Sequence, residues 1–454
     1  MAVARGTSNS SHESDSRYLK FKDELHRVVV DVADLSRIDR WSRDRLRNEV
    51  QGLGRKLAPQ IDRKIPTAEV DRAVDEVVDE VFGLGPIEPL LADPNVTEVL
   101  VNAPDQVYIE RNGRLRRVNV SFVDKAHLIR VIQKIASRVG RRVDESSPMV
   151  DARLPDGSRV NAVLPPLTLD SPVLSIRRFG QVFSPDDLIR LQSCTPEMIQ
   201  FLETIVACKT NTLISGGTGA GKTTLLNVLS AFIPSGERLV TIEDAAELKL
   251  QQPHVVRMET RAANMEGAGQ VTQRDLLRNA LRMRPDRIIL GEARGPEAVD
   301  MLQAMNTGHE GSLTTVHAND TRDALGRIEL MIGLAGLDLA VPVLRGYIAN
   351  AFHLLVHVSR LAGGARRITR ISELIGLRKG KSYRVRDIFV FEQTGVVNGN
   401  AIGQFKATGY VPLVLGRLEA AGHPLPASMF AERALLEIVP IATEGEVDGG
   451  QDDA

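Results

Sequence analysis

The chain has 454 residues, 43% of them hydrophobic and 25% charged, which is enough for about three domains with buried cores. Its formal net charge of −1 argues against the global basic field of a nucleic-acid-binding protein, and its two cysteines, Cys194 and Cys208, argue against a disulfide framework or a cysteine metal site. No apolar run reaches the length of a membrane span and the polar start carries no signal-peptide core, so the sequence predicts a cytoplasmic protein that reaches membranes only through partners.

The first part of the chain is predicted to be a tail followed by helices. Residues 1–16 are rich in Ser, Gly, His and Asp, a composition typical of disordered segments. Between residues 17 and 88, apolar residues recur at helical spacing among many charges, which predicts an N-terminal helical region whose last helix runs from about residue 67 to 82. The basic excess of residues 17–64 fits either a solvated helical face or a docking surface.

A small α/β domain, expected to be PAS-like, is predicted for residues 89–182. Strands are expected at 96–101, 107–110, 115–122, 150–162 (two strands joined by an Asp-Gly turn) and 174–179, with one helix at 124–139. Gly and Pro between two folded patterns predict a flexible linker at 180–185.

Residues 183–440 alternate between strands and helices, as a P-loop domain does. The expected strands are 210–214, 238–242, 287–290 and 311–317, and the expected helices begin near 224 or span 272–283, 296–306, 323–334 and 341–352. Strand-rich sequence follows to about residue 391, then a hairpin and short helices to 439. Residues 441–454 are predicted to form a disordered acidic tail.

The strongest motif is GGTGAGKTT at residues 216–224, which matches the phosphate-binding loop pattern G-x-x-x-x-G-K-[ST] between a predicted strand and a predicted helix. Its glycines let backbone N–H groups point inward at phosphate oxygens, and the following helix adds its positive N-terminal end. Lys222 is expected to reach the β- and γ-phosphates and the Thr223 hydroxyl to bind Mg²⁺. The other expected contacts to the nucleotide, ATP or ADP, are Gly216, Gly217, Thr218, Gly219, Ala220, Gly221 and Thr224.

Two groups of carboxylates follow predicted strands of the same domain. Glu292 comes just after the apolar strand 287–290, and Glu243, Asp244 and Glu247 come at the end of the strand 238–242. A lone acidic residue after a strand is often only a solvated loop residue. Two sets beside one phosphate-binding loop instead favour catalysis, because hydrolysis needs one carboxylate to activate water and another to help hold Mg²⁺.

Four segments together resemble the motor ATPases of type II and type IV secretion systems. They are GGTGAGKTT (216–224), IEDAAEL (242–248), RPDRIILGEAR (284–294), and TGHEG with TVHAN (307–319), which are similar to that family's Walker A, aspartate, Walker B and histidine boxes. Residues 144–162 and 387–393 are most similar to the CpaF/TadA ATPases of tight-adherence (Flp) pili. The chain lacks the paired C-x-x-C zinc module often carried by type II secretion ATPases.

The resemblance implies a role for residues at matching positions. Glu247 would activate water, Glu292 would be the Walker B carboxylate, and Asp244 would bind Mg²⁺ through water. His317 or His309 would sense the γ-phosphate, although either can be structural. The resemblance further implies that three arginines of the small domain move onto the γ-phosphate: Arg159, Arg177 and Arg178. The alternative is that they are ordinary arginines on the surface of that domain. Arg282 and Arg294 would stabilise a subunit interface.

The sequence therefore predicts an α/β fold: a RecA-like P-loop ATPase core preceded by a small α/β domain and an N-terminal helical region. The resemblance implies a cytoplasmic homohexamer that hydrolyses ATP with Mg²⁺ and drives assembly or retraction of a tight-adherence pilus through inner-membrane platform proteins. A VirB11-like type IV secretion ATPase and a nucleotide-switched scaffold with little turnover are the alternatives. A nucleic-acid translocase ranks behind both.

Overall fold

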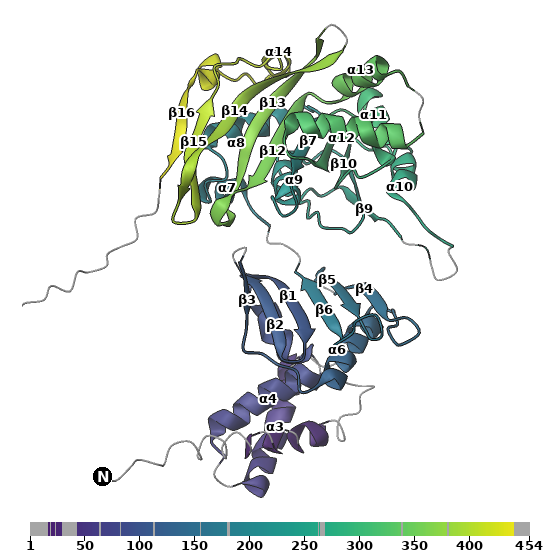
Figure 1. Cartoon of the computed structure of the whole chain (residues 1–454), viewed down its shortest axis with the longest axis vertical. Helices are drawn as coiled ribbons and strands as arrows, with labels where there is room; N and C mark the ends of the chain where they lie inside the picture. Colours follow the sequence, from purple (N-terminus) through teal and green to yellow (C-terminus); the bar gives the residue numbers. More distant parts are fainter. Residues whose placement is uncertain are drawn as a thin grey trace, which may run out of the picture. The chain divides into compact units, whose positions relative to one another are not determined.

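A computed structural model describes residues 17–18, 20–22, 24–29, 43–62, 65–81, 83–111, 114–154, 156–178, 182–261, 263, 268–336, 339–378 and 381–439. The predicted tails at 1–16 and 441–454 lie outside these ranges, as do residues 180 and 181 of the predicted linker. The chain divides into two compact units, residues 1–179 and 180–454 (Figure 1). No helix in the described ranges is both long and apolar enough to cross a membrane.

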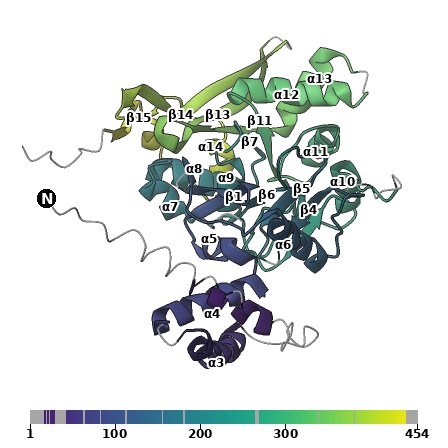
Figure 2. The same ribbon diagram turned by 60° about the horizontal axis from the view of Figure 1, so that its bottom comes forward.

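The first unit begins with packed helices. Helices α3 (Arg43–Ile61) and α4 (Thr67–Val81) lie side by side in both views (Figures 1 and 2), and residues 17–18, 20–22 and 24–29 are helical as well. Val70, Val74 and Val77 recur at helical spacing along α4 and are buried against Phe21 and Leu25. Burial of this apolar stripe is what stabilises the helical group.

The rest of the first unit is built on a six-stranded sheet in the order β3-β2-β1-β6-β5-β4, in which each strand pairs antiparallel with its neighbours. Helix α6 begins after Asp124, whose side chain accepts the His127 N–H, and its apolar face joins the core of the sheet. The elements are η1 (Gly85–Ile87), α5 (Glu88–Ala92), β1 (Val96–Ala103), β2 (Gln106–Arg111), β3 (Arg114–Arg117), α6 (Lys125–Arg138), β4 (Met149–Arg153), β5 (Arg159–Val163) and β6 (Val173–Arg177).

One predicted strand of this sheet is shorter than expected. The strand predicted at 115–122 ends at Arg117. The Phe122 N–H instead donates to the carbonyl oxygen of Pro104, and its ring packs edge-on against His127 in the core. Because Phe122 is buried by folding against α6 rather than by pairing, its apolar character does not extend the strand.

The second unit contains a ten-stranded sheet in the order β16-β15-β14-β13-β12-β7-β11-β10-β8-β9. Its elements up to the centre of the sheet are α7 (Pro185–Arg190), α8 (Pro196–Ala207), β7 (Thr212–Gly216), α9 (Lys222–Ser230), β8 (Leu239–Glu243), β9 (Val255–Glu259), α10 (Gln273–Ala280), β10 (Arg287–Leu290), α11 (Glu297–Asn306), β11 (Leu313–His317), α12 (Thr321–Leu334), α13 (Val341–Ala351) and β12 (Leu354–Arg360). The remaining elements are η2 (Ala362–Gly364), β13 (Arg366–Arg378), β14 (Ser382–Val397), β15 (Asn400–Ala407), α14 (Leu415–Ala420), η3 (Ala427–Phe430) and β16 (Arg433–Ile438).

The strands from β12 to β9 are parallel and covered by helices on both faces. Every residue of β7, β8 and β10 is buried, which explains why these strands read as near-continuous apolar runs. Ile214 contributes to the core that holds α8 and α9, whereas its neighbour Leu213 contributes to the core that holds α10 to α13. Strands β13 to β16 then continue the sheet antiparallel (Figure 1).

This arrangement confirms the predicted fold class. A parallel sheet carries a phosphate-loop sequence between β7 and α9, and functional groups gather where its strands end, as in RecA-like domains. The small α/β domain and the N-terminal helices precede it in the chain.

Candidate nucleotide site at the carboxyl ends of the parallel strands

The phosphate-loop sequence forms a tight turn between β7 and α9. Gly219 and Gly221 have φ values of +69° and +100°, a region that favours glycine. A methyl group on Gly216 would lie 2.4 Å from the carbonyl oxygen of Val358, so only glycine fits there. Gly221 has no side chain with which to cap α9, so the N–H groups of its first turn remain suited to phosphate oxygens.

Lys222 connects the loop to the two neighbouring strands. Its ammonium group lies 3.2 Å from the carbonyl oxygens of Gly216 and Gly217 and 3.2 Å from Nδ1 of His317. Nε2 of His317 lies 2.8 Å from Oε1 of Glu292. Strand β11 pairs directly with β7, with His317 opposite Gly216, and β10 pairs with β11. The register of these three strands therefore brings Lys222, His317 and Glu292 together.

The protonation of His317 follows from its neighbours. Burial lowers its pKa, the Lys222 charge acts in the same direction, and the Glu292 carboxylate opposes both. Burial also lowers the pKa of Lys222. A neutral imidazole in this position accepts a hydrogen bond at Nδ1 from the ammonium group and turns its Nε2–H towards the carboxylate. The histidine can thus hold Lys222 and Glu292 in fixed positions.

Arg294 links the two groups of carboxylates. Its Nε and Nη2 donate to Oε2 of Glu292 at 2.9 and 2.7 Å, and its Nη1 lies 3.3 Å from Oδ2 of Asp244. Hydrogen bonding to Glu292 raises the pKa of Arg294 despite partial burial. The Glu247 charge acts on both Lys222 and Arg294. Glu247 and Asp244 therefore lie in the same cluster as Glu292.

Glu243 is a buried residue of the site to which the sequence analysis gave no role of its own. Its Oε1 accepts the backbone N–H groups of Glu247 and Leu248 at 2.7 and 2.9 Å. It is 3% exposed, and burial raises its pKa to about 7. A methyl group on Gly291 would lie 2.9 Å from Cγ of Glu243, so this side chain touches both carboxylate-bearing loops. The role of Glu243 could have been found in the sequence from its position, because it is a carboxylate at the end of a largely apolar strand.

The other predicted residues of this unit lie away from the loop. His309 precedes β11, whereas His317 ends it, and a five-residue strand spans roughly 16 Å. Of the two histidines, only His317 contacts Lys222 in this structure. Arg282 is exposed just beyond α10, and its N–H donates to the carbonyl oxygen of Asn279. Its predicted role at a subunit interface remains a prediction.

The arginines of the first unit fall into two groups. Arg159 lies directly opposite Arg177 on β6 and Arg153 on β4, so three guanidinium groups share one face of the sheet. Arg177 is exposed, with Nε 3.8 Å from Oε1 of Glu98. Arg178 differs, because its Nη1 donates to the carbonyl oxygens of Asp93 and Val96 and so ties β6 to the start of β1. The register thus places Arg153 beside two of the three predicted arginines, Arg159 and Arg177, and the third, Arg178, has a structural contact.

The residues at the loop suit Mg²⁺ with a nucleotide. Mg²⁺ usually keeps several waters and is held by one or two carboxylates and the substrate phosphates, so it does not need a protein-only cage. Among the described residues, no group of three or more His, Cys, Asp and Glu side chains is arranged to hold a metal ion by itself. The Thr223 hydroxyl in the first turn of α9 and the carboxylates of Asp244 and Glu292 are suitable oxygen ligands, directly or through water.

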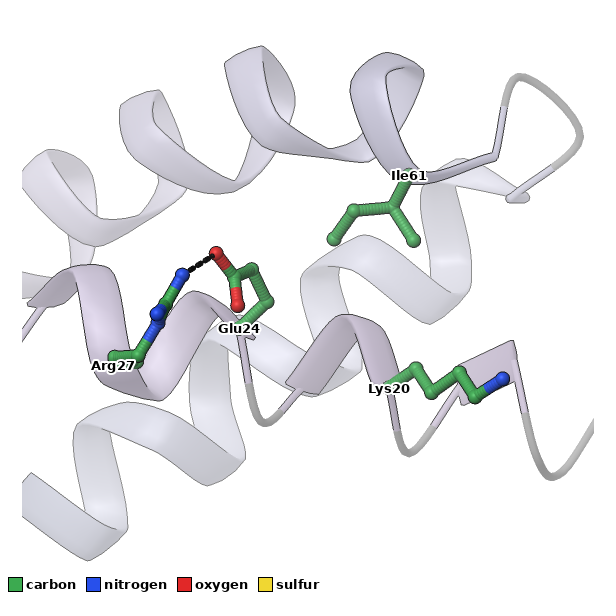
Figure 3. Close-up of a pocket in the computed structure, with 4 residues that line it drawn as sticks. All are labelled: Lys20, Glu24, Arg27 and Ile61. Carbon is green, nitrogen blue, oxygen red and sulfur yellow. Dashed lines mark hydrogen bonds and ion pairs between the residues drawn. The ribbon is translucent and has the colours of Figure 1, made fainter.

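A surface pocket of about 500 Å³ lies in the N-terminal helices instead (Figure 3). Lys20, Glu24, Arg27 and Ile61 line it, and Arg27 pairs with Glu24 across one turn. Its lining of Lys20, the Arg27–Glu24 pair and exposed Ile61 contains none of the phosphate-loop or carboxylate residues described above, so this pocket is not the candidate site.

The chain is similar to secretion ATPases over most of its length. A model of the family described as "Type II/IV secretion system protein" matches residues 80–362, more than half of the chain. A putative conjugal transfer protein of Mycobacterium tuberculosis is 43% identical over 306 residues, which cover 65% of this chain and 85% of that relative. The type IV secretion system protein VirB11 of Bartonella henselae is 32% identical over 317 residues, covering 62% of this chain and 89% of that protein.

Among solved structures, the VirB11 ATPase of the Brucella suis type IV secretion system is 31% identical, with a TM-score of 0.36 and coverage of 65% of this chain and 97% of that chain. The four sequence boxes that carry the predicted resemblance lie within the matched range up to residue 362. The resemblance to secretion ATPases is therefore confirmed at the level of the family, and the chain belongs to the type II/IV secretion system ATPase family.

Proposed function

We propose that this chain is a Mg²⁺-dependent ATP hydrolase that powers a secretion or pilus machine. The observation that carries the proposal is the continuous contact from Lys222 through His317 to Glu292, beside a glycine turn shaped for phosphate. A simple nucleotide switch needs the turn and the lysine. Hydrolysis needs in addition a carboxylate fixed beside the terminal phosphate. Glu292 can supply it, because Arg294 donates to its Oε2 and Nε2 of His317 lies 2.8 Å from its Oε1.

Each polar group of the cluster has a proposed part in hydrolysis. Lys222 neutralises charge on the β- and γ-phosphates, and Thr223 with Asp244 holds Mg²⁺, which would further neutralise the phosphates. Glu247 activates the attacking water, and Glu292 orients it and the metal's water shell. Arg294 and His317 keep Glu292 in position, because they contact different oxygens of its carboxylate. We also propose that Arg159 and Arg177 bind the terminal phosphate.

We propose further that the chain works as a cytoplasmic homohexamer at the inner face of the membrane and drives a tight-adherence pilus. The segments at 144–162 and 387–393 support this subtype, because they are most similar to the CpaF/TadA ATPases. A VirB11-like role in type IV secretion is the second candidate, and relatives named VirB11 and conjugal transfer protein support it. A non-piliated mutant of the gene would favour the first; loss of protein or DNA transfer with intact pili would favour the second.

The hydrolase is tested by phosphate release from the purified chain. We expect turnover of ATP that requires Mg²⁺, stops with EDTA and is abolished by Lys222→Ala. Lys209→Ala is the matched control, since Lys209 lies before β7 and pairs with Glu237 rather than with the cluster. Binding of ATP without phosphate release by the wild type would instead identify a nucleotide-switched scaffold.

A further inference from the structure

Two arginines from the turn between β12 and β13 lie against the phosphate loop. Strand β12 pairs in parallel with β7 on the side opposite to β11, with Val358 beside Gly216. Arg360 is two residues further on, where β12 ends, and lies directly opposite Arg366 at the start of β13. Residues directly opposite on an antiparallel pair point to the same face, so the two side chains leave the sheet together.

Both side chains reach the glycine turn itself. Nε of Arg366 donates to the carbonyl oxygen of Gly219 at 2.9 Å. A methyl group on Gly221 would lie 3.4 Å from Cδ of Arg366, and one on Gly219 would lie 3.6 Å from Nη1 of Arg360. The arginine pair therefore borders Gly219 and Gly221, two residues of the predicted phosphate loop.

The charge arrangement favours an anion at this place. The N-terminal end of α9 and the Lys222 ammonium group lie beside the two guanidinium groups, so four positive groups or dipole ends border the turn. A guanidinium group can donate two hydrogen bonds in one plane, which suits it to phosphate oxygens.

We propose that Arg360 and Arg366 bind the nucleoside end of the bound nucleotide by contacting its α-phosphate. This inference rests on the proposed function for the direction of the nucleotide. The carboxylate Glu292 and His317 lie on the β10–β11 side of the loop, and hydrolysis places the terminal phosphate there. The phosphate nearest the nucleoside then lies towards β12 and β13, where the arginine pair is.

The test measures equilibrium binding of a fluorescent ADP analogue to the full chain and its Arg360→Ala and Arg366→Ala variants. Loss of a charge-assisted hydrogen bond is expected to weaken ADP and ATP alike, by about tenfold or more in each variant. Arg378→Ala is the matched control, because Arg378 is exposed at the far end of β13. Its affinity for ADP should match that of the wild type.

A second measurement separates phosphate contact from simple bracing of the turn by Arg366. If the guanidinium groups contact phosphate, salt weakens ADP binding less in the variants than in the wild type, because a screened ion pair has been removed. Inorganic tripolyphosphate should lose affinity in parallel with ADP. Affinities within twofold of the wild type, an unchanged salt dependence, or unaltered tripolyphosphate binding would each overturn the assignment. If the wild-type chain binds ADP through these arginines but releases no phosphate from ATP, only the proposed hydrolase activity is contradicted.

Discussion

Glu243 offers a sharp test of how the aspartate-box segment is positioned. Replacing it with Ala removes the acceptor of two backbone N–H groups, those of Glu247 and Leu248, at 2.7 and 2.9 Å. Leu248 is fully buried, so its N–H would be left without this partner away from water. Such a loss costs roughly 1–3 kcal/mol for each buried donor. Because Glu247 is only half buried, we expect the lower part of the range for its N–H, and about 2–4 kcal/mol in total.

The expected effect on turnover is larger than the effect on binding. Glu247 is the proposed water-activating residue, and a displacement of about 1 Å in a catalytic group can slow the chemical step about a hundredfold. Glu243→Ala should therefore lower kcat by about that factor while KM changes little. Glu243→Gln keeps a carbonyl oxygen as acceptor and should stay within a few-fold of the wild type.

Steady-state phosphate release, with kcat and KM determined separately, checks this expectation alongside a thermal melt. Glu203→Ala, an exposed glutamate of α8, is the control for removal of a carboxylate. An Ala variant with wild-type kcat would refute the positioning role. A Gln variant as slow as the Ala variant would show that the charge of Glu243, rather than its acceptor oxygen, is what matters.

Three further predictions concern other parts of the chain. Arg159→Ala and Arg177→Ala should slow ATP hydrolysis at least tenfold, with little change in the affinity for ADP measured by titration. An equal loss of ADP affinity would mean that these arginines do not contact the terminal phosphate specifically. Arg178→Ala should instead lower the melting temperature, because the carbonyl oxygens of Asp93 and Val96 lose a donor; an unchanged melt would count against that anchoring role. Burial lowers the pKa of His357, whose Nδ1 lies 2.9 Å from the Ser215 hydroxyl, so the folded state keeps it neutral. The contribution of neutral His357 to stability is full above about pH 6.5 and is lost as the pH falls towards the lowered pKa. Between pH 8 and pH 5, the melting temperature should therefore fall less steeply in His357→Asn than in the wild type. Parallel curves of melting temperature against pH would contradict this role.

The sequence predicted the elements that position the site because their signals are local. A glycine-rich turn after an apolar strand and before a helix is defined by adjacent residues, and the structure places α9 directly after Gly221. Strand β10 is buried on both faces and reads as an apolar run after its first residue, Arg287, and it was predicted with the observed bounds. The fold class followed from the alternation of such strands with helices.

Features that depend on strand order could not be predicted in the same way. Nothing local distinguishes His317 from His309; the parallel pairing of β11 with β7 does, because it brings the end of β11 to the phosphate loop. Likewise, Arg177 and Arg178 are adjacent in sequence, but the alternation of the strand sends them to different partners. Arg366 is 147 residues from Gly219 along the chain, so only the folded sheet shows that they touch.

The central claim is that Glu292, held by His317 and Arg294 beside Lys222, serves the cleavage of ATP rather than its binding. The most direct measurement compares ATP affinity and single-turnover phosphate release in Glu292→Gln and the wild type. We predict an affinity within a few-fold of the wild type and a cleavage rate reduced by about a hundredfold or more. Cleavage at the wild-type rate, or a loss of ATP affinity that accounts for the whole defect, would contradict the account.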